Sequence, residues 1–286
     1  MDFKNIAVSR YKVMSRGHKA VTDFILGNMD EAAFMTAAAM AKAAGVSEST
    51  VVRYAVSLGY EGFPQLSAEL AREVKGRLTL AQRLEQSYGS GVRSELVTSV
   101  LSADMERIAD TIKMTDKAAF EAALDMIMKA RRIYVAGLRQ EAPLAGMLAF
   151  YLNMILGHTS QVSSSSMSEI FEQLLDLGEE DVVIGISFPK YSLRTLKVME
   201  FANERRCGII SITDGKHSPM NIYSSVNLFA RSDATSVVAS LAAPLSLINA
   251  LVAGLCLKDA DGIGSRLSAL DDIWKDFQYY GRDEME

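Results

Sequence analysis

Three short segments carry charged and hydroxyl side chains directly after runs of apolar residues: 137–141 (GLRQE), 187–192 (SFPKYS) and 214–218 (DGKHS). The first two contain the cations Arg139 and Lys190, which can pair with phosphate or carboxylate oxygens. Such groups bind anions most readily where a helix begins, because the first N–H groups of a helix have no intrahelical partner. The segments therefore predict a site for a small anionic ligand.

The predicted ligand-binding residues are Gly137, Arg139, Glu141, Ser187, Lys190, Ser192 and Asp214. Glu141 opposes an anion, because its carboxylate could pair with Arg139 or Lys190 and cancel their charge. It could also accept hydrogen bonds from sugar hydroxyls. An uncharged sugar or polyol, or a domain that only associates with its own copies, are the alternatives to an anionic ligand.

Residues suited to catalysis are sparse. An isomerase that moves a proton between adjacent carbons needs a base, and the candidates are Glu141, His158 and His217. His158 is expected to begin a strand. His217 could contact a ligand, but spacing alone does not identify a group that would orient it. Cys207 and Cys256 lie far apart among apolar or small residues, which predicts two reduced thiols. Because motifs for nucleotide phosphates, metal ligation and a Ser-His-Asp nucleophile are also missing, we expect no enzyme, no metal and no cofactor, with a sugar-phosphate isomerase as the alternative.

A second polar run lies at 45–54 (GVSESTVVRY). Ala41, Gly45 and Val51 supply a small residue where two helices cross, a glycine where the chain turns and an apolar anchor in the second helix. These are the steric needs of a helix-turn-helix. Inward packing of Val51 and Tyr54 would leave the small polar side chains of the second helix outside.

Such an outer face suits DNA. Arg53 can donate two hydrogen bonds to guanine, Val52 could meet a thymine methyl group, and Glu48 could accept only from cytosine. An ordinary helical hairpin with a solvated polar face is the alternative. The predicted DNA-binding residues are Ser47, Glu48, Ser49, Thr50, Val52 and Arg53.

The elements that must position these residues differ between the two parts of the chain. Residues 3–80 have helical periodicity throughout, which predicts about five short helices. Gly89-Ser90-Gly91 is the best linker candidate. Five apolar, β-branched runs then alternate with helical stretches, which predicts a five-stranded parallel α/β sheet with helices on both faces and ligands beyond the carboxyl ends of its strands. These runs are RRIYVAGL, GHTSQVSS, EDVVIGISF, RCGIISITD and SSVNLFARS.

Composition permits both parts. The 286 residues are 49% hydrophobic and 23% charged, which is enough for two domains. The net charge is -5, but residues 1–75 hold nine basic and eight acidic residues against 21 and 27 in the remainder. The first part is therefore compatible with DNA. Neither a signal-peptide pattern nor an apolar run of about 20 residues is present, so we expect a cytoplasmic protein that does not contact a membrane.

The run from Phe34 to Val74, including AGVSESTVVRYAVSLGYEGFPQL, resembles the N-terminal helix-turn-helix of the RpiR family of bacterial transcriptional regulators. Residues from about 115 to 255 resemble that family's SIS (sugar isomerase) domain, a five-stranded parallel α/β sandwich. The resemblance implies a multidomain chain: an all-α helix-turn-helix domain over 1–76, a helical linker over 77–114, and an α/β SIS domain for ligand sensing and dimerisation over 115–286.

The resemblance also implies a function. The protein would be a DNA-binding transcriptional regulator controlled by a carbohydrate-derived effector, such as a sugar phosphate. Its other partners would be a palindromic double-stranded DNA operator and further copies of the chain, as a dimer or a tetramer.

Two loops depart from the usual SIS pattern. A typical first loop reads G-x-G-x-S, and Arg139 and Glu141 stand in place of its second Gly and its Ser. A typical second loop reads S-x-S-G-x-T, and Pro189 and Lys190 replace its middle Ser-Gly. Together these changes predict an anion site that depends on charge pairing instead of a cradle of hydroxyls and glycines.

Overall fold

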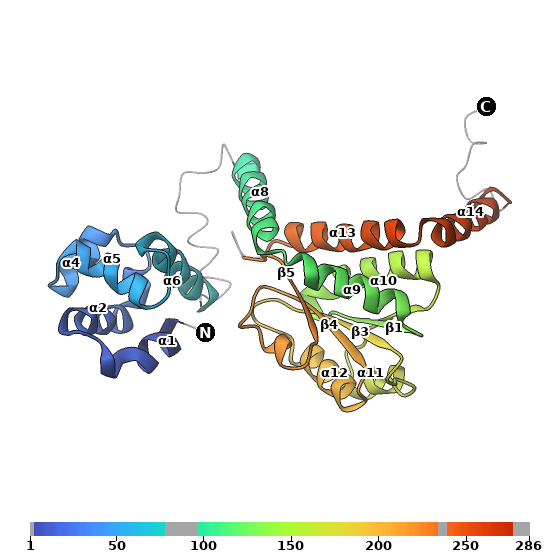
Figure 1. Ribbon diagram of the computed structural model, residues 1–286, viewed down its shortest axis with the longest axis horizontal. Coiled ribbons are helices and arrows are strands. Elements are labelled where there is room, and N and C mark those ends of the chain that lie inside the picture. Colours follow the sequence, from blue (N-terminus) through green and yellow to red (C-terminus); the bar gives the residue numbers. More distant parts are fainter. Residues whose placement is uncertain (1–2, 78–95, 234–238, 277–286) are drawn as a thin grey trace. The chain divides into compact units, whose positions relative to one another are not determined.

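The computed structural model describes residues 3–77, 96–233 and 239–276. They form two compact units, the first over 3–77 and the second over the other described residues (Figure 1). The predicted linker Gly89-Ser90-Gly91 lies outside the described residues.

The described part of the first unit consists of helices, as its periodicity predicts. Hydroxyl groups of Ser15, Thr36 and Ser47 accept a backbone N–H in the first turn of α2, α4 and α5, which satisfies donors that helix starts leave unpaired. The helices are α1 (Phe3–Arg10), η1 (Tyr11–Val13), α2 (Arg16–Gly27), α3 (Met29–Ala32), α4 (Ala37–Ala44), α5 (Glu48–Ser57) and α6 (Phe63–Arg77). Their shared core includes Phe3, Val21, Ile25, Met40, Val51, Tyr54, Leu66 and Leu70.

The second unit alternates strands and helices. Its strands are β1 (Ile133–Ala136), β2 (Thr159–Val162), β3 (Val182–Ile186), β4 (Gly208–Thr213) and β5 (Val226–Phe229). They form one sheet in the order β2-β1-β3-β4-β5, in which all neighbours are parallel. The five-stranded parallel sheet is therefore confirmed, and each strand falls within the run predicted for it.

Helices cover both faces of this sheet (Figure 1). One face packs against α9, α10 and α13, and the other packs against α11 and α12. Most strand residues are buried on both sides, as parallel sheets require. The helices and short turns of the unit are α8 (Leu96–Met114), α9 (Lys117–Lys129), η3 (Arg139–Glu141), α10 (Ala142–Leu156), α11 (Met167–Gln173), α12 (Leu193–Glu204), η4 (Pro219–Ile222), α13 (Ala242–Lys258) and α14 (Ala260–Asp276).

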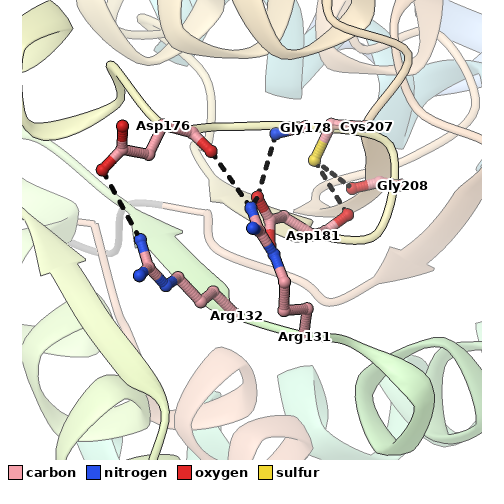
Figure 2. Close-up of polar contacts among 7 residues, drawn as sticks. All are labelled: Arg131, Arg132, Asp176, Gly178, Asp181, Cys207 and Gly208. Carbon is pink, nitrogen blue, oxygen red and sulfur yellow. Dashed lines mark hydrogen bonds and ion pairs between the residues drawn. The ribbon is translucent and has the colours of Figure 1, made fainter.

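Polar contacts around the buried Asp181 lie at the amino-terminal edge of the sheet (Figure 2). Arg131 donates from Nη2 and Nε to the two carboxylate oxygens of Asp181, at 2.7 and 2.9 Å, and the Gly178 N–H donates to the same carboxylate at 2.9 Å. Burial by itself would raise the pKa of Asp181, but these donors hold it below its ordinary value. The Cys207 thiol donates to the Asp181 carbonyl at 2.9 Å, and burial raises the pKa of this thiol to about 12. These groups are committed to the fold, which leaves the carboxyl-terminal edge for a ligand.

In the part of the chain that the structure describes, no single helix has both the length and the apolarity to cross a membrane. The helices α13 and α14 reach that length and composition only as a pair, and they are bent by 105° where they meet.

Candidate functional site

The helix α5 turns the predicted polar face outward. Met40 and Ala41 of α4 and Val51 and Tyr54 of α5 are buried where the two helices meet. Gly45 makes the turn between them with a φ of 67°, in the left-handed region that favours glycine. This geometry confirms the predicted helix-turn-helix.

Tyr54 fixes the position of α5 against α2. Its hydroxyl accepts a hydrogen bond from Thr22 at 2.8 Å, and its ring lies edge-on to His18 with 5.6 Å between centroids. Burial raises the pKa of the Tyr54 phenol far above its ordinary value, so the side chain stays neutral. A buried, hydrogen-bonded tyrosine therefore sets the direction in which the outer face of α5 points.

Two of the predicted DNA-binding residues also have structural partners. Ser47 caps α5, with its Oγ accepting from the Thr50 N–H at 3.2 Å and lying 2.9 Å from the Ser49 Oγ. Thr50 is half-buried and packs closely against α2. A Cβ added to Gly17 of α2 would lie only 3.1 Å from the Thr50 methyl group. Arg53 donates to the Ser49 Oγ at 3.5 Å and remains exposed. The residues most open to a DNA groove are Glu48, Ser49, Val52 and Arg53.

The second candidate site lies at the centre of the sheet. Strands β1 and β3 are neighbours, but β2 follows β1 on one side and β4 follows β3 on the other. The connecting loops therefore separate at the carboxyl ends of β1 and β3, and α/β sheets bind ligands at such a switch point. The loops 137–141 and 187–192 meet there, joined by a hydrogen bond of 3.4 Å from the Phe188 N–H to the Glu141 Oε1.

Arg139 and Lys190 occupy unusual backbone positions in these two loops. Their φ angles are 66° and 73°, in the left-handed region that non-glycine residues rarely adopt. At both positions a typical SIS loop has a glycine. Each loop thus has the backbone conformation that a glycine would adopt, but it carries an exposed cationic side chain at that position.

Gly137 permits the first turn. A Cβ at this position would stand 2.9 Å from both the Ala145 Cβ and the Glu141 carbonyl oxygen, which is closer than real contacts allow. Any side chain at Gly137 would therefore push the loop away from the start of α10.

Glu141 does not pair with a cation. Its side chain is 3% exposed, and its Oε1 accepts from the Gln140 amide at 2.9 Å as well as from the Phe188 N–H. Burial raises the pKa of Glu141, although these donors and the nearby Arg139 act in the opposite direction. The possible ion pair with Arg139 or Lys190 is not formed, because the carboxylate points into the junction between the two loops and accepts hydrogen bonds there.

The two predicted serines shape the second loop. Ser187 is fully buried, and its Oγ accepts from the Ser192 N–H at 3.0 Å. Ser192 in turn caps α12, with its Oγ accepting from the Thr195 N–H at 3.3 Å. Both hydroxyl oxygens thus act within the loop, and Lys190 is left as its projecting group.

Asp214 ties the third loop to the second. Its Oδ1 accepts from the Tyr191 hydroxyl at 2.7 Å and from the Thr213 hydroxyl at 3.3 Å. We did not predict a role for Tyr191, although it lies beside Lys190 in the sequence and carries a hydroxyl suited to this contact. Six of the seven predicted residues therefore lie in the two joined loops, and Asp214 is linked to them through Tyr191.

Of the two candidate histidines, His158 stands apart from this arrangement, whereas His217 lies in the third loop with Asp214. His158 directly precedes β2, and its Nδ1 lies 3.0 Å from the Leu156 carbonyl oxygen, at the amino-terminal side of the sheet. His217 is exposed in the loop after β4. Both cysteines are free thiols, and the described residues include no cluster of His, Cys, Asp and Glu suited to a metal.

Comparison with known families agrees with this geometry. A model of the helix-turn-helix domain of the rpiR family matches residues 1–76, and a model of the SIS domain matches residues 126–254. The fold and the two family models thus define a helix-turn-helix transcriptional regulator with a SIS domain. The chain belongs to the RpiR family.

The chain is also similar to proteins named as transcriptional regulators. The chain is 23% identical to an uncharacterized HTH-type transcriptional regulator of Clostridium perfringens, over 75% of this chain and 76% of that protein. It is 25% identical to the HTH-type transcriptional regulator HexR of Pseudomonas aeruginosa, over 72% of this chain and 70% of that protein.

Two solved structures are also similar. The sugar isomerase domain of an RpiR transcription factor from Sphaerobacter thermophilus has 25% identity and a TM-score of 0.60, covering 62% of this chain and 99% of that chain. The NanR protein of Vibrio vulnificus, complexed with ManNAc-6P, has 18% identity and a TM-score of 0.60, covering 94% of this chain and 96% of that chain. At this identity the likeness to NanR shows the fold alone.

Proposed function

We propose that this regulator binds a DNA operator through α5 and that an anionic sugar derivative, bound at the carboxyl edge of the sheet, changes the affinity for the operator. The observation that carries the proposal is the pair of cations, Arg139 and Lys190, held at positive φ on the two loops that meet at the switch point. The protein acts as a homo-oligomer in the cytoplasm and reads a palindromic site. It is not an enzyme.

Backbone strain supports a role for these cations in binding. A non-glycine residue in the left-handed region costs about 1 to 3 kcal/mol, and such residues gather at functional sites. Arg139 and Lys190 lie in successive loops of one edge, and among the described residues neither side chain has an ion-pair or hydrogen-bond partner. A ligand phosphate or carboxylate would supply that partner, with charge-assisted hydrogen bonds to both.

The neighbouring polar groups suit the rest of a sugar. Asp214 is a hydrogen-bond acceptor and Tyr191 carries a hydroxyl, both in the loops around the cations. Sugar hydroxyls need such acceptors. The fold likeness to NanR, whose structure holds ManNAc-6P, supports the same ligand class.

The DNA-binding part of the proposal depends on α5. Its exposed Arg53 and Val52 can reach base edges in a major groove, and the buried Val51 and Tyr54 hold the helix on its domain. The first 75 residues carry almost no net charge, so one copy would bind DNA weakly. Two linked copies on a palindrome would reach useful affinity.

An isomerase is the second candidate, because the raised pKa of Glu141 would suit a general base. The buried carboxylate already accepts from Phe188 and Gln140, however, and the relatives of this chain are named transcriptional regulators. Turnover of a sugar phosphate by the wild type, abolished in Glu141→Gln, would favour this candidate over the regulator.

The ligand test begins with a thermal-shift screen of sugar phosphates, sugar acids and polyols, followed by calorimetry of the strongest ligand. We expect an anionic sugar to bind, and we expect Arg139→Ala and Lys190→Ala each to weaken it about tenfold or more, as loss of a charge-assisted hydrogen bond requires. Arg206→Ala is the matched control, since Arg206 is an exposed cation at a φ of 55° before β4, at the opposite edge. Equal losses in all three variants would refute the site.

A further inference from the structure

The helix α8 docks on its own unit through polar side chains. Ser240 donates to the Asp104 carboxylate at 2.6 Å, and Arg107 forms an ion pair of 3.0 Å with the same carboxylate. Thr111 accepts from the Arg231 N–H at 3.0 Å. Arg107 and Thr111 are buried, so the side of α8 that faces the unit is the polar side.

The side of α8 centred on Met105 is apolar and exposed. Val97 is 71% exposed, Met105 70% and Ile112 69%. Leu101 and Ala109 are also exposed and lie on the same side, because residues three or four positions apart share one face of a helix. A helix on a protein surface normally buries its apolar face and exposes its polar one. We call the exposed apolar residues of α8 the stripe; they are Val97, Leu101, Met105, Ala109 and Ile112. The stripe departs from that pattern, and a partner that buried it would stabilise the protein.

The position of α8 leaves this stripe accessible to a second molecule. Figure 1 shows α8 crossing the first turns of α13, with one end beside β5 and the other projecting beyond the helices of its unit. Residues 96–100 are exposed without exception, which agrees with a helix whose first turns touch nothing in this unit.

The stripe is self-complementary when two copies of α8 pack antiparallel. When two copies of α8 run antiparallel with Met105 opposite Met105, Val97 lies opposite the turn that carries Ile112, and the large Leu101 lies opposite the small Ala109. Large residues against small ones let two helices interdigitate. The stripe holds no charged side chain, so two copies meet without repulsion between like charges.

The exposed area is also suited to a pair. The stripe exposes on the order of 500 Å² per copy, which brings a pair of helices to about the 1,000 Å² that a specific interface needs. We infer that α8 is a self-association helix that pairs antiparallel with α8 of a second copy, with Met105 at the two-fold axis. This inference rests on the homo-oligomer proposed above and names its surface.

Cross-linking tests this register directly. Met105→Cys in a Cys256→Ser background, treated at low protein concentration with a short bis-maleimide, should give a covalent dimer, because the two thiols face each other across the axis. Leu175→Cys in the same background is the control, since Leu175 is equally exposed at 69% but follows α11 on the other face of the sheet. A Met105→Cys chain that links no better than the Leu175→Cys chain would overturn the inference.

A charge variant tests the same surface without chemical modification. Met105→Glu places two carboxylates at the axis and should raise the dimer dissociation constant at least tenfold in sedimentation measurements, while Leu175→Glu should leave it unchanged. Circular dichroism should show both variants folded, since both side chains are exposed. If Met105→Glu remains a dimer, α8 pairing is wrong, although a regulator that dimerises elsewhere would stand. If the wild type is a monomer, another part of the chain covers the stripe, and both the inference and the proposed oligomer fail.

Discussion

Replacing Lys190 by glycine and by alanine separates the charge of this residue from its backbone. Lys190 has a φ of 73°, and an L-residue in the left-handed region costs about 1 to 2 kcal/mol. Alanine keeps that cost, whereas glycine removes it and loses about 0.4 to 1 kcal/mol through greater freedom of the unfolded chain. The glycine variant should therefore be more stable than the alanine variant by about 1 kcal/mol. For a unit of this size, that difference corresponds to about 2 to 4 °C in the melting temperature.

Thermal unfolding and ligand calorimetry of the two variants provide the assay. Both variants lack the cation, so both should bind the strongest ligand of the screen more weakly by the same factor, about tenfold or more. Equal melting temperatures would contradict the strained backbone. Undiminished ligand binding in both would remove Lys190 from the site, and binding retained by the glycine variant alone would mean that loop conformation, not charge, holds the ligand.

Three further predictions concern the DNA-binding helix and the amino-terminal edge of the sheet. Arg53→Ala should weaken operator binding by about 1 to 3 kcal/mol in fluorescence anisotropy with no change in circular dichroism; unaltered affinity would exclude Arg53 from the interface. Val51→Asp should unfold the first unit, because it buries an unpaired charge, and a folded variant would contradict the anchor role. The pKa of Asp181 lies below its ordinary value in the folded protein, so its contribution to stability is complete above about pH 4 and is lost as the pH falls through the folded pKa. Arg131→Met should flatten that loss in urea titrations between about pH 2 and pH 5, and an unchanged acid dependence would refute the pairing.

Much of the fold could be predicted because it depends on local patterns. Gly45 needs a left-handed backbone, Ser47 caps a helix, and Val51 and Tyr54 lie on one face, so the helix-turn-helix is readable from residues that are close in sequence. The strands are equally readable, since buried parallel strands are short apolar runs between helices. The sheet order then follows from the fold class, and it brings the loops of Arg139 and Lys190 together.

The details that could not be predicted depend on contacts between distant segments. Glu141 meets the Phe188 N–H, and Tyr191 meets Asp214, only because the loops after β1, β3 and β4 lie side by side. Periodicity shows that α8 has two unlike faces, but its polar anchor depends on Arg231, which lies 120 residues further along the chain. Spacing alone could not indicate that the polar face is the buried one.

The central claim is that a ligand at the sheet edge controls DNA binding by α5. The most direct measurement is the operator affinity with and without saturating ligand, together with the ligand affinity with and without saturating operator. We predict that the two affinities change by the same factor, about 5- to 150-fold, because coupling between two sites is reciprocal. In Lys190→Ala, ligand-free operator binding should equal that of the wild type, and ligand at the wild-type saturating concentration should change it far less. A ligand that binds the wild type at this edge and leaves operator affinity unchanged would contradict the account.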